Sequence, residues 1–270
     1  MAQNKSRPTN QQRRDAARER MRAERERQTR RASRRKAAAI GAAIVVVIAA
    51  AAGISIALAD HHPKSSSTAL VLPAHSTGSN GTTVVYGKAT SPEVLDVYED
   101  FRCPVCDKFE KADAAIVQQL ADNGTYVIHY HMGTFLDSNL GGNGSHRALA
   151  AAGAALNEST AMFKAWHDEI YANQPASEDT DSFSSTSFLL SLAKKVPGLS
   201  TPAFVKAVQD GTYLPWANKV SDAFNASGVT GTPTFKLNGK ALTLFDSTGN
   251  PVSATQYTQA VQQAIAATKK

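Results

Sequence analysis

The sequence is poor in cysteine and in aromatic residues. Only 2 of its 270 residues are cysteine, which excludes a small scaffold stapled by several disulfides and a protein built from multiple zinc fingers. Aromatic residues make up 7% of the chain, yet hydrophobic residues as a whole make up 42%. A chain of this length and hydrophobic content buries at least one sizeable core, which excludes a short peptide and an entirely disordered protein.

Charge is missing from one stretch of the chain. Residues 37–59 contain no charged side chain, and their branched apolar residues lie on an alanine background. As a helix this stretch would be about 35 Å long, enough to cross a hydrocarbon core of about 30 Å, so we expect a single transmembrane helix there. A cleaved signal peptide is the alternative, suggested by Ala57-Leu58-Ala59, but both the apolar run and its basic leader are longer than is typical.

Positive charge is concentrated before this stretch. Residues 1–36 carry 14 Lys and Arg against 4 Asp and Glu, a net charge of +10, and the rest of the chain carries −4. Positively charged flanks stay in the cytoplasm, so we expect a cytoplasmic tail and an extracytoplasmic C-terminal part in a single-pass protein of the cell membrane. The tail is expected to be mostly disordered and not to bind nucleic acid; a charged helix on anionic lipid or nucleic acid is the alternative. Residues 60–82, with Ser65-Ser66-Ser67 and two prolines, are expected to form an extracytoplasmic linker.

The remaining residues, 83–270, predict one α/β domain. We expect strands at 83–86, 94–98 and about 126–132, a helix from the cysteines to Asn123-Gly124, a helical insertion over about 139–228, a hairpin of 234–237 and 241–245 around Asn238-Gly239, and a last helix after a capping box at Ser253 and Gln256. The expected helical core faces are Phe109, Ala112, Ile116 and Leu120; Phe163, Trp166 and Ile170; Leu189, Leu192 and Val196; and Trp216, Val220, Ala223 and Phe224.

The two cysteines are separated by two residues, in Cys103-Pro104-Val105-Cys106, where a strand passes into a helix. This spacing lets the two sulfurs close a small ring. The free N–H groups and the dipole of a helix N-terminus favour a thiolate, which is the attacking species in disulfide exchange. We therefore expect Cys103 to be an exposed nucleophile and Cys106 to be the resolving thiol. Pro104 suits the first helical turn because it has no N–H to leave unpaired.

Two other interpretations of the pair stay open. The sequence has no second Cys-x-x-Cys, so a zinc site would need other ligands, for which His129 and His131 are the best substitutes because alternate strand residues share a face. A purely structural disulfide is the second alternative. We expect neither of these, and no metal or cofactor; His129 and His131 are expected to be ordinary strand residues.

A second motif, Gly231-Thr232-Pro233-Thr234-Phe235, favours the redox interpretation. With Asp100-Phe101-Arg102-Cys103-Pro104-Val105-Cys106 and the helical insertion between them, it resembles the thioredoxin superfamily, and within it the DsbA-like thiol-disulfide oxidoreductases. The resemblance covers residue 83 to the C-terminus. It implies a thioredoxin-like fold with an inserted helical subdomain, a cis Thr232–Pro233 bond beside the cysteines, and a substrate contact at Thr232.

The sequence departs from this family at one position. Many relatives carry a buried acid six residues before the first cysteine, where this chain has Val97. Asp96, Glu99 or Asp100 could substitute, but we expect all three to be solvated charges at the end of a strand.

These observations predict a membrane-anchored extracytoplasmic thiol-disulfide oxidoreductase. We expect a dithiol oxidase that forms disulfides in exported proteins with free thiols and is reoxidised by a membrane redox partner. A reductase or isomerase remains an alternative, as does a non-catalytic thioredoxin-like binding module whose cysteines form a structural bridge.

Overall fold

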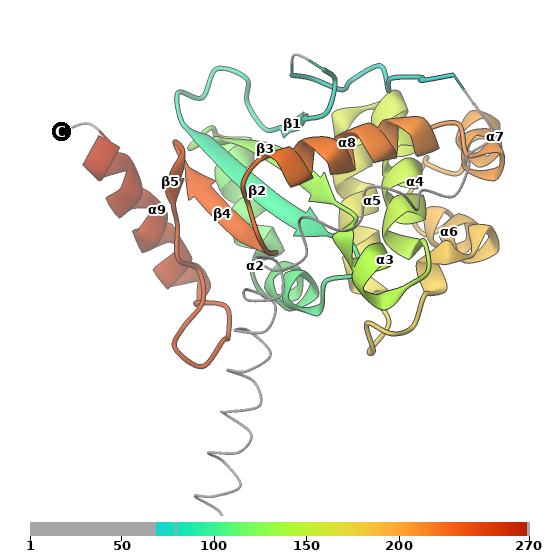
Figure 1. Cartoon of the computed structure of the whole chain (residues 1–270). Helices are drawn as coiled ribbons and strands as arrows, with labels where there is room; N and C mark the ends of the chain where they lie inside the picture. Colours follow the sequence, from blue (N-terminus) through green and yellow to red (C-terminus); the bar gives the residue numbers. More distant parts are fainter. Residues whose placement is uncertain (1–68, 79, 269–270) are drawn as a thin grey trace, which may run out of the picture. The chain divides into compact units, whose positions relative to one another are not determined.

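The computed structural model describes residues 69–78 and 80–268 (Figure 1). The cytoplasmic tail predicted over 1–36 and the membrane anchor predicted over 37–59 lie outside the described residues, as does much of the predicted linker. None of the helices within the described residues is long and apolar enough to cross a membrane.

A mixed sheet of five strands organises the domain. The strands are β1 (Val84–Tyr86), β2 (Val94–Asp100), β3 (Val127–Gly133), β4 (Thr234–Leu237) and β5 (Lys240–Ala241), in the order β1-β3-β2-β4-β5. The pair β2 and β3 is parallel, and the other neighbours are antiparallel. Helix α2 (Pro104–Asn123) connects the two parallel strands, as a parallel crossover requires. The mixed α/β class expected from the sequence is confirmed.

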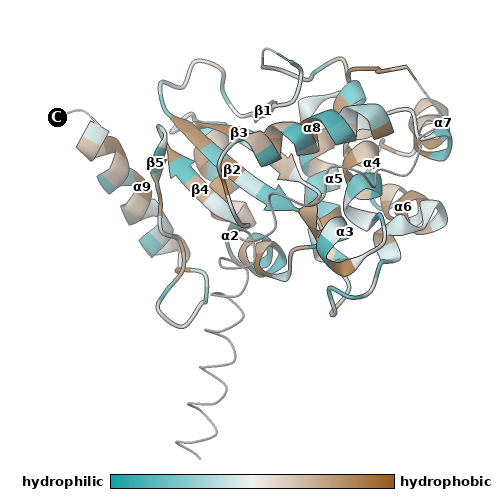
Figure 2. Ribbon diagram, viewed as in Figure 1, coloured by the Kyte–Doolittle hydropathy of each residue, from teal (hydrophilic) through white to brown (hydrophobic). Residues whose placement is uncertain are grey.

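Side chains on the two faces of the sheet meet different helices. On one face Phe235 of β4 packs against Phe109 of α2, with ring centroids 4.3 Å apart, and Tyr257 of α9 (Ala254–Thr268) joins them. On the other face Tyr98 of β2 meets Phe224 of α8 (Leu214–Ala226), at 6.1 Å. Strand β2 therefore carries both hydrophobic and hydrophilic residues, which Figure 2 shows along its length.

Helices fill the chain between β3 and β4. They are α3 (Phe135–Leu140), α4 (Gly144–Glu158), α5 (Thr160–Ala172), a 3-10 turn at Ser182–Ser184, α6 (Thr186–Ala193), α7 (Pro202–Asp210) and α8. Three of these helices have a hydroxyl residue as N-cap. The side chains of Ser159, Ser185 and Thr201 accept backbone hydrogen bonds at the N-termini of α5, α6 and α7. The alanine-rich α4 is buried on almost every side, because small residues let its neighbours approach closely.

Most of the expected core faces are buried. All the residues named for α5 and for the α6 region are buried, including Val196, which lies beyond the end of α6. Two positions are wrong, since Ala112 and Ala223 are exposed. In α2 the buried face contains Phe109 and Leu120 as expected, and it also contains Cys106, Glu110, Asp113 and Val117.

The C-terminal elements follow local sequence signals. Asn238 and Gly239 form the hairpin turn with φ of 53° and 76°, a left-handed conformation that this dipeptide tolerates. Strand β5 is shorter than predicted and ends at Ala241, although Leu242 N–H still donates to Phe235 O. The capping box is confirmed, because Ser253 N–H donates to Gln256 Oε1 and Gln256 N–H donates to Ser253 Oγ.

The packing of α4 against α8 gives a prediction about Gly153. A β-carbon at this position would lie 2.8 Å from Trp216 Cε3 and 2.9 Å from Tyr213 Cβ. A Gly→Ala change inside a helix normally stabilises by about 1 kcal/mol. We expect Gly153→Ala to lower the free energy of unfolding by about 1–3 kcal/mol because of overpacking, measured by urea denaturation. A stabilised variant would contradict this packing.

Candidate active site

Cys103 lies where β2 ends and α2 begins. It is the N-cap residue of α2, its N–H donates to Asp100 O, and Pro104 occupies the first helical turn. Cys106 lies one turn into the helix and is fully buried. The four residues of the motif thus have the strand-to-helix placement expected from the sequence.

Cys103 is not exposed as expected, since only 5% of it is accessible to solvent. Two distant segments cover it. The loop before β4 lies against its sulfur, and Gln174 Nε2 donates to the carbonyl oxygens of Cys103 and Phe101 at 3.1 and 2.8 Å. Pro104 and Val105, the latter 38% exposed, are the side chains that the motif presents to solvent.

The second motif lies beside the first. Tyr98 of β2 pairs with Thr234 of β4, which brings the preceding Thr232 to Cys103, and Cys103 Sγ lies 3.4 Å from Thr232 O. The Thr232–Pro233 bond is cis, as the resemblance implies. The structure therefore brings together Cys103, Cys106, Thr232 and Pro233. Cys103 and Thr232 are 129 residues apart in the sequence.

The two thiols have opposite electrostatic surroundings. A hydrogen bond from the Cys106 thiol lowers the pKa of Cys103 against the effect of burial, and the Thr232 side chain adds to this lowering. The Thr232 hydroxyl is buried and has no hydrogen-bond partner among the described residues, so it can donate to a thiolate at Cys103. Burial raises the pKa of Cys106 well above its ordinary value, and the hydrogen bond and charge of Cys103 and the charge of Glu99 raise it further.

Two acids expected to be solvated are buried. Glu99 and Asp100 are fully inaccessible, and Asp96 is half-buried; Val97, at the position of the missing acid, belongs to the core. The expectation was wrong for Glu99 and Asp100 because β2 continues to Asp100, and the inserted helices cover this end of the strand.

Glu99 belongs to a buried cluster with His167 of α5 and Glu110 of α2. His167 Nε2 lies 2.8 Å from Glu99 Oε2, and His167 Nδ1 lies 3.9 Å from Glu110 Oε2. Burial and the charge of Glu99 raise the pKa of Glu110 to about 8. Burial opposes a charge on His167, but the charge of Glu110 and hydrogen bonds to Asp168 and Glu99 outweigh it and raise the pKa of His167 to about 9.

Glu110 and His167 were not expected from the sequence. The spacing held a signal, because Cys106, Glu110, Asp113 and Val117 follow one another at intervals of four, three and four residues, and so share one face of α2. A helix that buries its second cysteine therefore also buries these acids.

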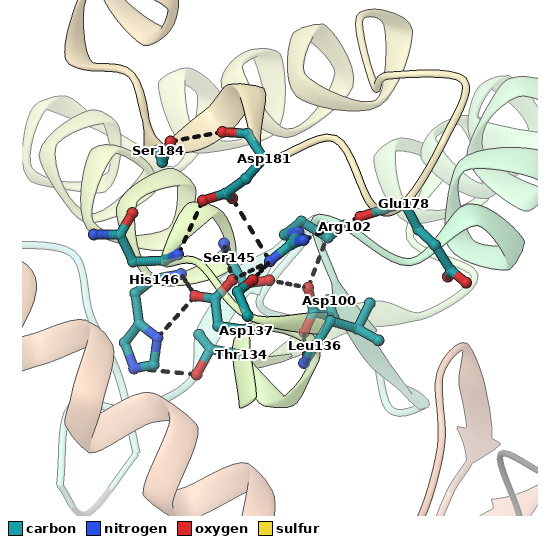
Figure 3. Close-up of polar contacts among 12 residues, drawn as sticks. Asp100, Arg102, Thr134, Leu136, Asp137, Ser145, His146, Glu178, Asp181 and Ser184 are labelled. Atoms are coloured by element: carbon teal, nitrogen blue, oxygen red, sulfur yellow. Dashed lines mark hydrogen bonds and ion pairs between the residues drawn. The ribbon is translucent and has the colours of Figure 1, made fainter. Parts of the chain in front are cut away.

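A second polar network holds the turn before Cys103, as Figure 3 shows. Asp100 Oδ1 accepts hydrogen bonds from Ser145 Oγ at 2.6 Å and from Arg102 N–H at 2.9 Å. Arg102 Nη1 pairs with Asp137 Oδ1 at 2.8 Å and donates to Gly141 O, and Nη2 donates to Glu178 O. Burial raises the pKa of Asp100 to about 6 in spite of these hydrogen bonds. The network ties the motif to the inserted helices.

The structure does not bring His129 and His131 to the cysteines. Both histidines lie on the face of the sheet that carries Tyr98, away from α2. Within the described part of the chain, no cysteine belongs to a group of side chains close enough together to hold a metal ion. The Cys2His2 alternative is therefore wrong.

The buried cluster predicts a pH dependence of stability. The folded-state pKa of Glu110, about 8, exceeds its ordinary value of 4.5, so between these pH values the folded chain binds more protons than the unfolded chain. The free energy of unfolding then falls as pH rises through this range. We expect Glu110→Gln to make the slope between pH about 5 and about 8 less negative by up to about 1.4 kcal/mol per pH unit, measured by urea denaturation. Glu178→Gln, at an exposed position, is the matched control and should leave the slope unchanged; equal slopes for all three proteins would count against the cluster.

The chain is similar to known proteins over most of the described domain. The thioredoxin family model matches residues 79–263. The protein named "Disulfide bond formation protein D" from Bacillus subtilis (strain 168) is 24% identical over 162 residues, which cover 60% of this chain and 70% of that protein.

Solved structures agree with this match. The reduced form of the disulfide bond oxidoreductase DsbG from Mycobacterium tuberculosis is 26% identical, with a TM-score of 0.57 over 69% of this chain and 88% of that one. Oxidised DsbA from the same organism is also 26% identical, with a TM-score of 0.55 over 68% and 92% of the two chains. The thioredoxin-like fold and the resemblance stated from the two motifs are confirmed: the chain belongs to the thioredoxin family, among its DsbA-like thiol-disulfide oxidoreductases.

Proposed function

We propose that this oxidoreductase is a membrane-anchored extracytoplasmic dithiol oxidase that forms disulfides in exported proteins through Cys103 and Cys106. The observation that carries the proposal is the opposite shift of the two thiols, with the pKa of Cys103 lowered and that of Cys106 raised. A low pKa at Cys103 makes it a good leaving group and stabilises the reduced form, as an oxidant requires.

The oxidase reaction consists of two exchanges. A substrate thiolate attacks Cys103 Sγ of the oxidised enzyme, the Cys103–Cys106 bond breaks, and Cys106 leaves and takes up a proton. A second substrate thiolate then attacks the substrate sulfur of the mixed disulfide. The substrate disulfide forms, Cys103 leaves as the thiolate, and the two electrons of the substrate remain on the enzyme dithiol.

The surroundings of the dithiol support the other roles that we propose. The Thr232 backbone lies next to the sulfur, and we assign to it the pairing with an extended substrate segment like an added strand. Pro104 and Val105 form the exposed surface beside it, and Val105 offers an apolar contact. We assign Pro233, which follows Thr232 in the loop that covers Cys103, to the substrate cleft.

The cellular setting rests on the sequence. The uncharged stretch 37–59 and the basic residues before it favour an anchor with the catalytic domain outside, in a compartment where disulfides persist. Turnover requires an oxidant that removes two electrons from the dithiol, and we assign this to a membrane redox partner. The name of the Bacillus subtilis relative, which refers to disulfide bond formation, supports this direction of electron flow.

The first test replaces each cysteine with serine. Because Cys103 carries the mixed disulfide with the substrate and Cys106 is the enzyme thiol that can displace the substrate from it, we expect Cys103→Ser to abolish catalysed oxidative refolding of a reduced test protein. Cys106→Ser should accumulate mixed disulfides with exported proteins, detected on non-reducing gels. The double variant is the control and should trap nothing. Refolding by Cys103→Ser would overturn the proposal; a parent enzyme that only reduces disulfides would indicate a reductase, and a bridge that stays closed in strongly reducing buffer would indicate a structural disulfide.

The second test concerns the Thr232 hydroxyl, which is buried beside the sulfur without a hydrogen-bond partner among the described residues. Thr232→Val keeps the shape of the side chain and removes the donor. We expect the pKa of Cys103 to rise by about one unit, followed by the ultraviolet absorbance of the thiolate against pH. Thr230→Val, at an exposed position of the same loop, is the matched control. An unchanged pKa in Thr232→Val would show that the hydroxyl does not contact the thiolate.

A further inference from the structure

A cluster of three metal-ligating side chains lies on the face of the sheet turned away from α2. Asp96 comes from β2, and His129 and His131 come from β3, with Asp96 paired in register with His129. Asp96 Oδ1 lies 2.8 Å from His131 Nε2 and 3.7 Å from His129 Nδ1. One ligand atom from each residue lies within 4.8 Å of the others. We propose that Asp96, His129 and His131 bind a divalent transition-metal ion of the zinc class.

The distances suit such an ion. Zinc bonds of about 2.0–2.1 Å to imidazole nitrogen and carboxylate oxygen place tetrahedral ligand atoms about 3.3–3.4 Å apart. The two separations from Asp96 Oδ1, 2.8 and 3.7 Å, lie on either side of this value. The two imidazole nitrogens lie within 4.8 Å of each other, so side-chain rotations that bring the three separations to the tetrahedral value would complete the site. A simple hydrogen bond explains the approach of His131 but not the second imidazole nitrogen turned toward the same oxygen.

The types of ligand select the metal. Two imidazoles with one carboxylate favour zinc, cobalt, nickel or copper over magnesium and calcium, which prefer oxygen ligands. Three protein ligands leave the fourth position to water or to a group from outside. The side chains are between 19% and 31% exposed, so an ion can reach them from solvent.

The surroundings hold the ligands in place. The Tyr98 ring stacks on His131, with centroids 4.5 Å apart and planes at 15°, and Phe224 of α8 packs against Tyr98. Lys236 of β4 lies opposite Asp96 in the register, but its ammonium lies over the Tyr98 ring, 5.0 Å from the centroid. A bound ion would link β2 to β3, the central strands of the sheet, one of which leads to Cys103.

Zinc titration of the full-length protein tests the proposal. The dithiol is first oxidised, so that its thiolates do not compete for the ion. By isothermal titration calorimetry we expect one Zn²⁺ per chain, and at least about tenfold weaker binding in His129→Ala, His131→Ala and Asp96→Asn. Zn²⁺ should also raise the melting temperature of the parent and not that of the variants.

Histidines outside the cluster provide the matched control. A triple variant with alanine at His61, His62 and His75 removes three histidines and should bind Zn²⁺ as the parent does. Loss of binding in this control, or unchanged binding in all three ligand variants, would overturn the site. If a ligand variant unfolds, Co²⁺ titration of the parent decides: absorption bands of tetrahedral Co²⁺ in the visible support the site, and their absence overturns it.

Discussion

The antiparallel pairing of β2 with β4 is the constraint on which the active site depends. It places Thr232 O 3.4 Å from Cys103 Sγ, although the two residues are 129 positions apart. The same register turns Phe235 toward Phe109, so the core contact that seats α2 on the sheet and the contact that covers the nucleophile are set together. A slip of one residue would turn every β4 side chain to the opposite face, and both contacts would be lost. The hydrophobic core therefore stabilises the strand register that sets the geometry of the dithiol.

The groups around the dithiol give its two thiols different pKa values. Cys103 is at the open end of α2, where the Cys106 thiol and the Thr232 side chain stabilise a negative charge on it. Cys106 is deeper, and the charge of Glu99 opposes a second negative charge there. Buried acids are costly unless they have partners. Here Glu99 forms a hydrogen bond with His167 of α5, and Asp100 accepts one from Ser145 of α4. The inserted helices therefore supply the partners of both buried acids.

Local signals in the sequence predicted much of the fold, because they act over a few residues. Pro104 begins α2 and Gly124, with a φ of 87°, ends it; Asn238 and Gly239 make the turn, and Ser253 caps α9. The motif spacing likewise placed Cys103 and Cys106. The burial of Glu99, Asp100 and Cys103 was not predicted, because it depends on helices and loops far away in the sequence that cover the end of β2. Hydropathy assigns an acid at a strand end to solvent and does not register which segment will pack over it.

The position of the buried acid shows how the insertion and the sheet depend on each other. In many relatives the acid is six residues before the first cysteine, where this chain has Val97 in its core. Glu99 lies two residues further along β2 and on the same face, since side chains alternate, and is therefore about 7 Å nearer the end of the strand. This face of the strand therefore also carries a buried acid in this chain, but two residues closer to Cys106. At its new place the carboxylate meets His167 of α5, a residue of the insertion, at 2.8 Å. A buried acid at this position needs a partner, and an inserted helix provides it, so the electrostatics of the dithiol depend on both the sheet and the inserted helices.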